Sequence, residues 1–162
     1  MKYIDIHSHL GFEDYGQDKN DVIKRMKEAE VGTIAIGADL ASSIDAVKVA
    51  NENDTVWACI GMHPNHNVTE IFDEQKYEEL IKNPKVVAIG ECGLEYYKLT
   101  GDIEKIKEKQ KADFIKQIKL AIKYNKPLML HIREAFDDAY DILKEYKGQV
   151  RGDVHFFTGK LE

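Results

Sequence analysis

Short apolar runs alternate with amphipathic segments at regular spacing along all 162 residues of the chain. The runs are mostly apolar, as in strands buried on both faces, and the segments between them carry apolar residues at helical spacing. Because parallel strands need a crossover helix between them, this alternation predicts a parallel β-sheet covered by helices. The expected strands are residues 3–6, 33–36, 56–60, 85–89, 127–130 and 154–157, and the expected helices are residues 21–30, capped by Asn20, and 43–51, 74–81, 102–124 and 134–146.

Four of the expected strands lead to residue types that bind metal ions. The first is followed by His7 and His9, the fourth by Glu91 and the fifth by His131, and the sixth contains His155. Two histidines two positions apart on an extended segment point to one face and can chelate a single ion. The competing interpretations are solvated loop histidines, a surface or helix-capping carboxylate, and hydrogen-bonded core histidines. A separate explanation would be needed for each of the four strands. The presence of imidazole or carboxylate groups on all four therefore favours one shared metal cluster.

The placement of these residues favours a (β/α)8 barrel over a doubly wound sheet. A doubly wound sheet binds its ligand at one switch point with few strand ends, whereas a barrel gathers the carboxyl ends of all its strands at one mouth. A complete barrel takes ~250 residues, and only six strand units can be counted here. We therefore predict an α/β fold of the TIM-barrel type, incomplete, with about six of its eight strands. The domain is expected to cover residues 1–160, with Leu161-Glu162 either native or vector-derived.

Composition excludes several classes of function. A net charge of −6 argues against a protein that holds nucleic acid mainly through a basic face, although bound divalent cations would invert the local field at an acidic site. The two cysteines, Cys59 and Cys92, lie in apolar runs without a CxxC pair, which predicts neither disulfides nor a structural zinc site. With no signal-like start and no apolar run long enough to span a bilayer, we expect a cytoplasmic protein without a membrane partner.

The candidate ligands are imidazoles and a carboxylate, without a thiolate. This set suits Zn, Mn, Mg, Co or Fe and does not choose among them. Two divalent metal ions are expected, because Glu91 could bridge them. Two adjacent ions activate a water molecule and clamp the attacking and leaving oxygens of an in-line displacement, which indicates hydrolysis, most naturally of a phosphoester.

Five segments of the chain closely resemble the TatD-type metal-dependent deoxyribonucleases, a family of amidohydrolase-like barrels. They are residues 4–10 (IDIHSHL), 61–64 (GMHP), 90–97 (GECGLEYY), 127–135 (PLMLHIREA) and 155–159 (HFFTG), and they follow one another in the family's order. The resemblance spans nearly the whole chain. It implies a TIM-like barrel with a two-ion site that hydrolyses phosphodiester bonds, typically in DNA.

The resemblance also implies roles for individual residues. His7, His9 and Glu91 would bind one ion, and Glu91 would bridge to a second ion held by His131 and His155. The family continues through two more strand units, and the Asp that closes its eighth strand and acts on the attacking water has no counterpart here. We therefore expect slow turnover from this chain.

Two further residues are expected beside the ions. His63 would line the site, where it contacts a substrate phosphate or assists proton transfer as a catalytic group with Glu91; the alternative is a turn residue packed on the rim. Arg133 would meet a phosphate, or else serve as a structural ion-pair partner. His66 is expected at the surface. Glu95 stands where the family usually has Asp.

Three functions remain open at this point. The first is a TatD-like nuclease acting on DNA or a smaller phosphoester, the second another barrel hydrolase acting on C–N, ester or lactone bonds, and the third a non-catalytic fragment. A lysine bridging the metals would favour the second class, and no lysine ends a candidate strand. The edges of an incomplete barrel are also expected to cause self-association.

Overall fold

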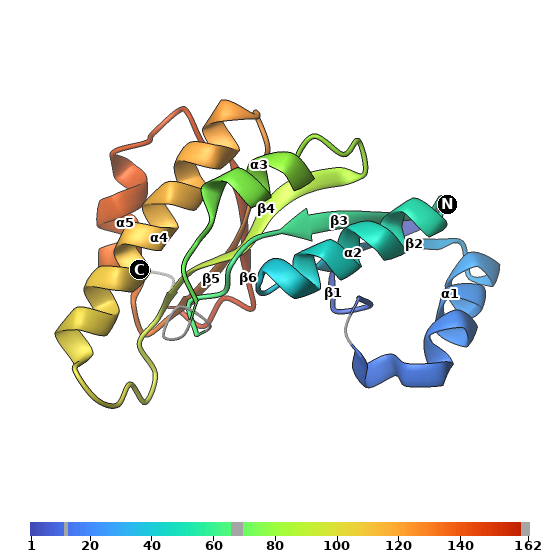
Figure 1. Ribbon diagram of the computed structural model, residues 1–162, viewed down its shortest axis with the longest axis horizontal. Coiled ribbons are helices and arrows are strands. Elements are labelled where there is room, and N and C mark those ends of the chain that lie inside the picture. Colours follow the sequence, from blue (N-terminus) through green and yellow to red (C-terminus); the bar gives the residue numbers. More distant parts are fainter. Residues whose placement is uncertain (12, 66–69, 160–162) are drawn as a thin grey trace.

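A six-stranded, entirely parallel sheet forms the centre of the computed structural model, which describes residues 1–11, 13–65 and 70–159 (Figure 1). The strands are Tyr3–Ser8 (β1), Val31–Ile36 (β2), Val56–Ile60 (β3), Val86–Glu95 (β4), Leu128–Arg133 (β5) and Gly152–His155 (β6). The helices are Lys19–Glu28 (α1), Leu40–Glu52 (α2), Glu74–Leu80 (α3), Ile103–Lys123 (α4) and Phe136–Lys144 (α5), preceded by a short 3-10 segment at Glu13–Asp18.

The strand order and the curvature of the sheet identify a barrel wall. The strands are ordered β1 to β6 as in the sequence, each parallel to the next, whereas a doubly wound sheet reverses direction at a switch point. In a flat sheet the outermost of six strands would lie roughly 24 Å apart. Instead, the rings of His7 on β1 and His155 on β6 stack with centroids 3.6 Å apart. The expected α/β fold of the TIM-barrel type, with six strands, is therefore confirmed.

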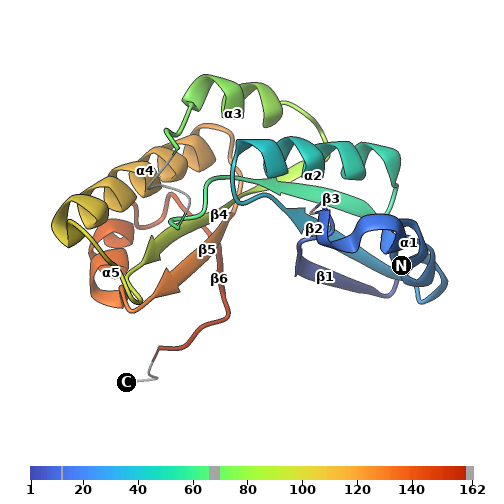
Figure 2. The same ribbon diagram turned by 60° about the horizontal axis from the view of Figure 1, so that its bottom comes forward.

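Helices α2, α3 and α4 lie along one face of the sheet, as both views show (Figures 1 and 2). The main core lies between these helices and the sheet. It includes Phe114 and Ile118 of α4, both fully buried. A second, smaller cluster of buried side chains comes from neighbouring strands. Because successive side chains of a strand point to opposite faces, this cluster lies on the face of the sheet away from the main core. Its members are Ile36, Cys59, Ala88 and Met129. Cys59 and Cys92 are both buried free thiols.

The fourth strand is longer than expected, and this changes the place of Glu91. The expected strand ends at residue 89. Strand β4 instead continues to Glu95, with Gly90 at φ 146° and Gly93 at φ 143°. A Cβ atom on Gly93 would lie 2.1 Å from the carbonyl oxygen of His131 on β5, so only glycine allows this close approach of the strands. Glu91 therefore lies inside a strand and not after its end.

Other boundaries also differ from the expected ones. The first helix begins at Lys19, so Asn20 lies within it and is not its cap; Asp18 precedes the helix without a side-chain capping bond. Helix α2 begins at Leu40 because Asp39 accepts a hydrogen bond from the backbone N–H of Ser42 at 2.7 Å. The sixth strand comprises residues 152–155 in place of the expected 154–157, and the fifth extends to residue 133. Strand 56–60 is as predicted.

Some expectations fall outside the described residues. These are the surface position of His66, the domain end at residue 160, and the nature of Leu161 and Glu162. Among the helices that the structure describes, none combines the length and the apolar character needed to cross a membrane.

Candidate metal centre

Glu91 is the centre of the candidate site. Its side chain is buried, and its two carboxylate oxygens face three histidines. Oε1 lies 3.0 Å from Nδ1 of His131 and 3.8 Å from Nε2 of His63, and Oε2 lies 3.5 Å from Nε2 of His7. Burial alone would raise the pKa of this carboxyl, but hydrogen bonds from His131 and His7 and the charge of His63 hold its pKa well below the usual range. Glu91 is thus an ionised, buried carboxylate surrounded by imidazoles.

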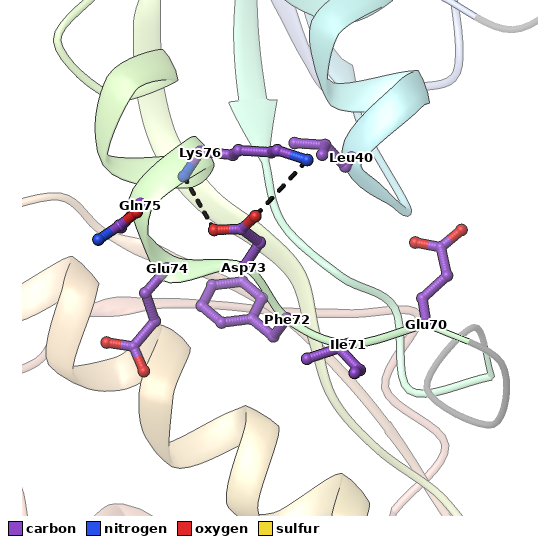
Figure 3. A pocket seen from close by; sticks show the side chains of 8 residues that line it. All are labelled: Leu40, Glu70, Ile71, Phe72, Asp73, Glu74, Gln75 and Lys76. Carbon is purple, nitrogen blue, oxygen red and sulfur yellow. Dashed lines mark hydrogen bonds and ion pairs between the residues drawn. The ribbon is translucent and has the colours of Figure 1, made fainter.

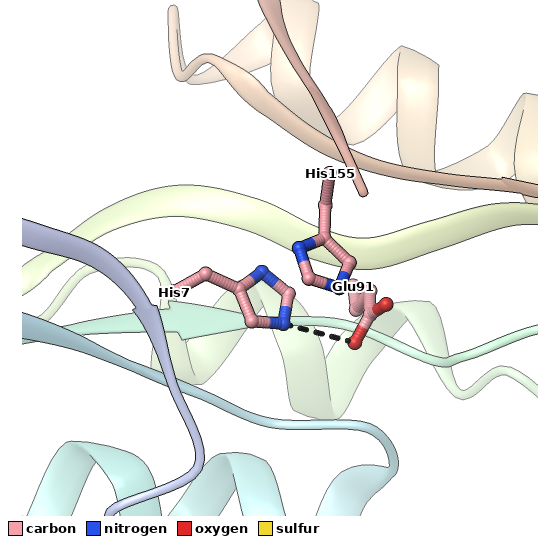
Figure 4. A group of neighbouring side chains, drawn as sticks. All are labelled: His7, Glu91 and His155. Carbon is pink, nitrogen blue, oxygen red and sulfur yellow. Dashed lines mark ion pairs between the residues drawn. The ribbon is translucent and has the colours of Figure 1, made fainter. Parts of the chain in front are cut away.

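The first group of potential ligands contains His7, Glu91 and His155. Their ligand atoms lie within 4.8 Å of one another, and Figure 4 shows the two rings stacked beside the carboxylate. The interplanar angle of these rings is 9°. Burial and the neighbouring His7 lower the pKa of His155, which favours the neutral imidazole that metal binding requires. His9 follows β1, with its ring in edge contact with that of His7 at 5.1 Å between centroids.

The second group contains His63, Glu91 and His131. The rings of the two histidines lie 4.2 Å apart. Nδ1 of His63 accepts a hydrogen bond from the backbone N–H of Asn65 at 3.1 Å, and this bond orients Nε2 toward Glu91. Burial alone would lower the pKa of His131, but its hydrogen bonds to Glu91 and Glu95 outweigh burial and raise it.

The structure therefore brings His7, Glu91, His131 and His155 together, while His9 lies beside His7 and belongs to neither group of potential ligands. Which ion each histidine binds stays a prediction. The sequence-based grouping joined His155 to His131. In the structure His155 stacks on His7, because β6 approaches β1 across the open side of the curved sheet, and His63 occupies the place beside His131.

Glu95 is a site residue that the sequence analysis did not identify. It is 3% exposed and its Oε2 lies 3.0 Å from Nε2 of His131. The signal that would have found it is its spacing: Glu91 and Glu95 are four residues apart on one strand and therefore on one face. The expected strand ends at residue 89, so the sequence did not place Glu91 and Glu95 on the same strand.

Arg133 lies at the end of β5 with an exposed side chain. Its guanidinium stacks on the ring of Tyr97 at 3.8 Å, and Nζ of Lys98 lies 4.8 Å from the same ring. Within residues 1–11, 13–65 and 70–159, Arg133 makes no ion pair with a carboxylate. A pocket of about 170 Å³ adjoins it, lined by His131, Ile132, Arg133, His155, Phe156 and Thr158.

A larger open pocket of about 560 Å³ lies elsewhere, over the start of α3 (Figure 3). Its lining includes the carboxylates of Glu70, Asp73 and Glu74, while its single cation, Lys76, pairs with Asp73 at 3.6 Å. None of the predicted site residues lines this pocket. Its charge is unsuited to an anionic substrate.

The residues of the candidate centre fit divalent metal ions. Imidazole and carboxylate are suitable ligands for such ions. In addition, Nδ1 of His7 is buried, and within the described parts of the chain it has no hydrogen-bond partner. A buried imidazole nitrogen without a partner is costly unless something binds it, and a metal ion would do so.

The family model "TatD related DNase" matches residues 4–162. An uncharacterized metal-dependent hydrolase of Bacillus subtilis, YabD, is 38% identical over 163 residues, covering 98% of this chain and 62% of that protein. The 3'-5' ssDNA/RNA exonuclease TatD of Shigella flexneri is 32% identical over 161 residues, covering 98% and 60% respectively.

A solved structure is also similar. The crystal structure of YjjV, a TatD homologue from Escherichia coli, aligns with a TM-score of 0.86 at 28% identity, covering 98% of this chain and 61% of that chain. The chain thus spans about 60% of the length of the curated relatives it matches.

Proposed function

The chain belongs to the TatD-related DNase family, and from that membership we propose that it serves the metal-dependent hydrolysis of phosphodiester bonds in nucleic acid. The observation that carries the proposal is the Glu91 carboxylate, whose two oxygens face separate groups of histidines. Relatives with the names metal-dependent hydrolase and ssDNA/RNA exonuclease support the reaction class.

The proposed centre would hold two divalent ions. His7, Glu91 and His155 could bind one, and Glu91 and His131 could bind the other. When bound, such ions lower the pKa of a water molecule and stabilise the charge on the attacking and leaving oxygens. His9 lies beside His7, and we keep it as a proposed ligand of the first ion. Zn, Mn, Mg, Co and Fe all remain suitable, because the ligand types do not distinguish them.

His63 is proposed to act on the substrate. The backbone N–H of Asn65 donates to Nδ1, so a neutral His63 ring carries its hydrogen on Nε2, the atom that faces Glu91. An N–H there can donate to a phosphate oxygen or transfer a proton to a leaving group. Glu91 and His63 are the proposed catalytic pair.

Arg133 is proposed to bind a phosphate of the substrate. Its guanidinium stacks on the ring of Tyr97, and Lys98 adds a second cation next to the same ring. This small basic cluster lies at the pocket beside His131 in a chain whose net charge is −6. DNA is the proposed substrate, with a smaller phosphoester as the alternative. The cytoplasm is the proposed compartment, on the strength of the two reduced cysteines.

Metal removal is expected to abolish hydrolysis. Dialysis against a chelator should stop the release of nucleotides from the end of a single-stranded DNA, and adding back Mn²⁺ or Mg²⁺ should restore it. The same preparation is assayed on amide and lactone substrates, which the alternative hydrolase classes would cleave. Nucleotide release that persists without divalent ions, or faster cleavage of an amide or lactone, would contradict the proposed reaction.

Self-association through the sheet edges is also proposed. Among the described residues, strands β1 and β6 each pair on one side only, and β1 exposes Tyr3, Ile4 and Ile6 by 68%, 51% and 46%. Such an edge favours pairing with another chain. We expect light scattering to give a mass above that of a monomer at micromolar concentrations. Ile4→Lys should shift this mass toward the monomer, while Ile44→Lys, at a similarly exposed position on α2, should not. A stable monomer for the unmodified chain would contradict the proposal.

A further inference from the structure

Glu95 is held in one orientation by four hydrogen-bonding contacts. One carboxylate oxygen, Oε1, accepts from the backbone N–H of Tyr97 at 2.8 Å, and the other lies 3.0 Å from Nε2 of His131. The backbone of the same residue is fixed by Gln110 of α4. The N–H of Glu95 donates to Oε1 of Gln110 at 2.9 Å, and its carbonyl accepts from Nε2 of Gln110 at 3.1 Å. A buried side chain with both oxygens engaged has little freedom to move.

This arrangement places a hydrogen on Nε2 of His131. An ionised carboxylate only accepts hydrogen bonds, so the nitrogen facing Glu95 must be the donor, Nε2–H. The other nitrogen, Nδ1, points into the centre, 3.0 Å from Oε1 of Glu91, to which it donates in the absence of an ion. A metal ion beside Glu91 would take the place of the hydrogen on Nδ1, while Nε2–H keeps Glu95 as its acceptor. The direction of the ring thus suits metal binding through Nδ1.

We propose that Glu95 is a positioning residue of the metal centre: its carboxylate orients His131 and keeps Nδ1 of that ring available to an ion next to Glu91. The inference rests on the proposed function, because it assumes that His131 binds a metal. Partners of this kind on the far side of a metal-bound histidine typically change metal affinity 10- to 100-fold.

A purely structural role for Glu95 makes a different prediction. If the carboxylate only ties β4 to β5, its loss changes stability and leaves the affinity of the folded protein for metal ions unchanged. The distance from Glu95 to His131 is the same under both interpretations, so the measurement must separate affinity from stability.

Glu95→Gln tests the inference. Its amide oxygen keeps the bond from Tyr97, which turns the NH₂ group toward Nε2 of His131 and favours the tautomer with hydrogen on Nδ1. We expect titration calorimetry with Zn²⁺ to show a 10- to 100-fold loss of affinity for one ion. Glu95→Asp keeps the carboxylate acceptor and should recover most of the affinity. Asp113→Asn, at a buried carboxylate on α4 paired with Lys109 and Lys116, is the matched control and should bind Zn²⁺ as the unmodified chain does.

A measurement on the unmodified chain keeps the inference falsifiable if Glu95→Gln does not fold. Nitrogen NMR of the Zn²⁺-loaded protein should show a hydrogen on Nε2 of His131 and none on Nδ1. A hydrogen on Nδ1, or a Glu95→Gln variant that binds every ion with unchanged affinity, would overturn the inference alone. An unmodified chain that binds no divalent ion would contradict the proposed function itself, and the inference with it.

Discussion

Glu91→Gln is expected to lower divalent-dependent phosphodiester hydrolysis by about 10³-fold or more. Glu91 is the one carboxylate shared by both groups of potential ligands in the described chain, so the change removes negative charge from both ions at once. The amide is nearly the same size as the carboxyl, and the fold should survive. Rates of nucleotide release at saturating Mn²⁺ measure the effect, with unfolding curves recorded in parallel.

The control for this change is Glu79→Gln, an exposed glutamate on α3 without an ion pair among the described residues. It should leave the rate within experimental error of the unmodified chain. If Glu91→Gln retained more than about a tenth of the activity, the central place of Glu91 would be refuted.

Gly93→Ala is expected to destabilise the protein by about 3 kcal/mol or more. The backbone of Gly93 has φ 143°, which side-chain-bearing residues rarely adopt, and the new Cβ would lie 2.1 Å from the carbonyl oxygen of His131. Both atoms belong to paired strands, so relief of the clash requires β4 and β5 to separate. The melting temperature should fall by roughly 6–12 °C.

Gly101→Ala separates the two causes of this loss. Gly101 also has a positive φ, 90°, but no atom lies within 4 Å of the position of its Cβ. It should cost only the conformational part, about 1 kcal/mol. Equal losses in the two variants would show that β4 and β5 leave room for a Cβ atom at Gly93, contrary to the 2.1 Å between its Cβ position and the carbonyl oxygen of His131.

The sequence predicts the class of fold well because its signal is repeated. Six apolar runs with intervening helical periodicity leave few alternatives to a parallel sheet, and the fifth unit carries the same pattern as the first. The ends of strands and helices are harder to predict where a residue lies in a kind of element that it usually avoids. Gly90 and Gly93 are typical of a turn, yet they lie within β4 because the neighbouring strand approaches too closely for a side chain.

The site was predictable as a set of residues but not as an arrangement. His7, Glu91, His131 and His155 are marked in the sequence by their position within or next to short apolar runs, a local property. The stacking of His155 on His7 depends on how far the sheet curves, and the pairing of Glu95 with His131 depends on the register of β4 against β5. Neither the curvature of the sheet nor the register of its strands can be predicted from one segment, because both depend on packing across the whole sheet.

Crystals of the protein loaded with Zn²⁺, measured at the zinc absorption edge, test the central claim most directly. The proposal predicts two anomalous peaks on either side of the Glu91 carboxylate, each about 2 Å from its ligands. One should touch His7 and His155, and the other should touch Nδ1 of His131. Density with no peak at Glu91, or with zinc bound only elsewhere on the surface, would contradict it.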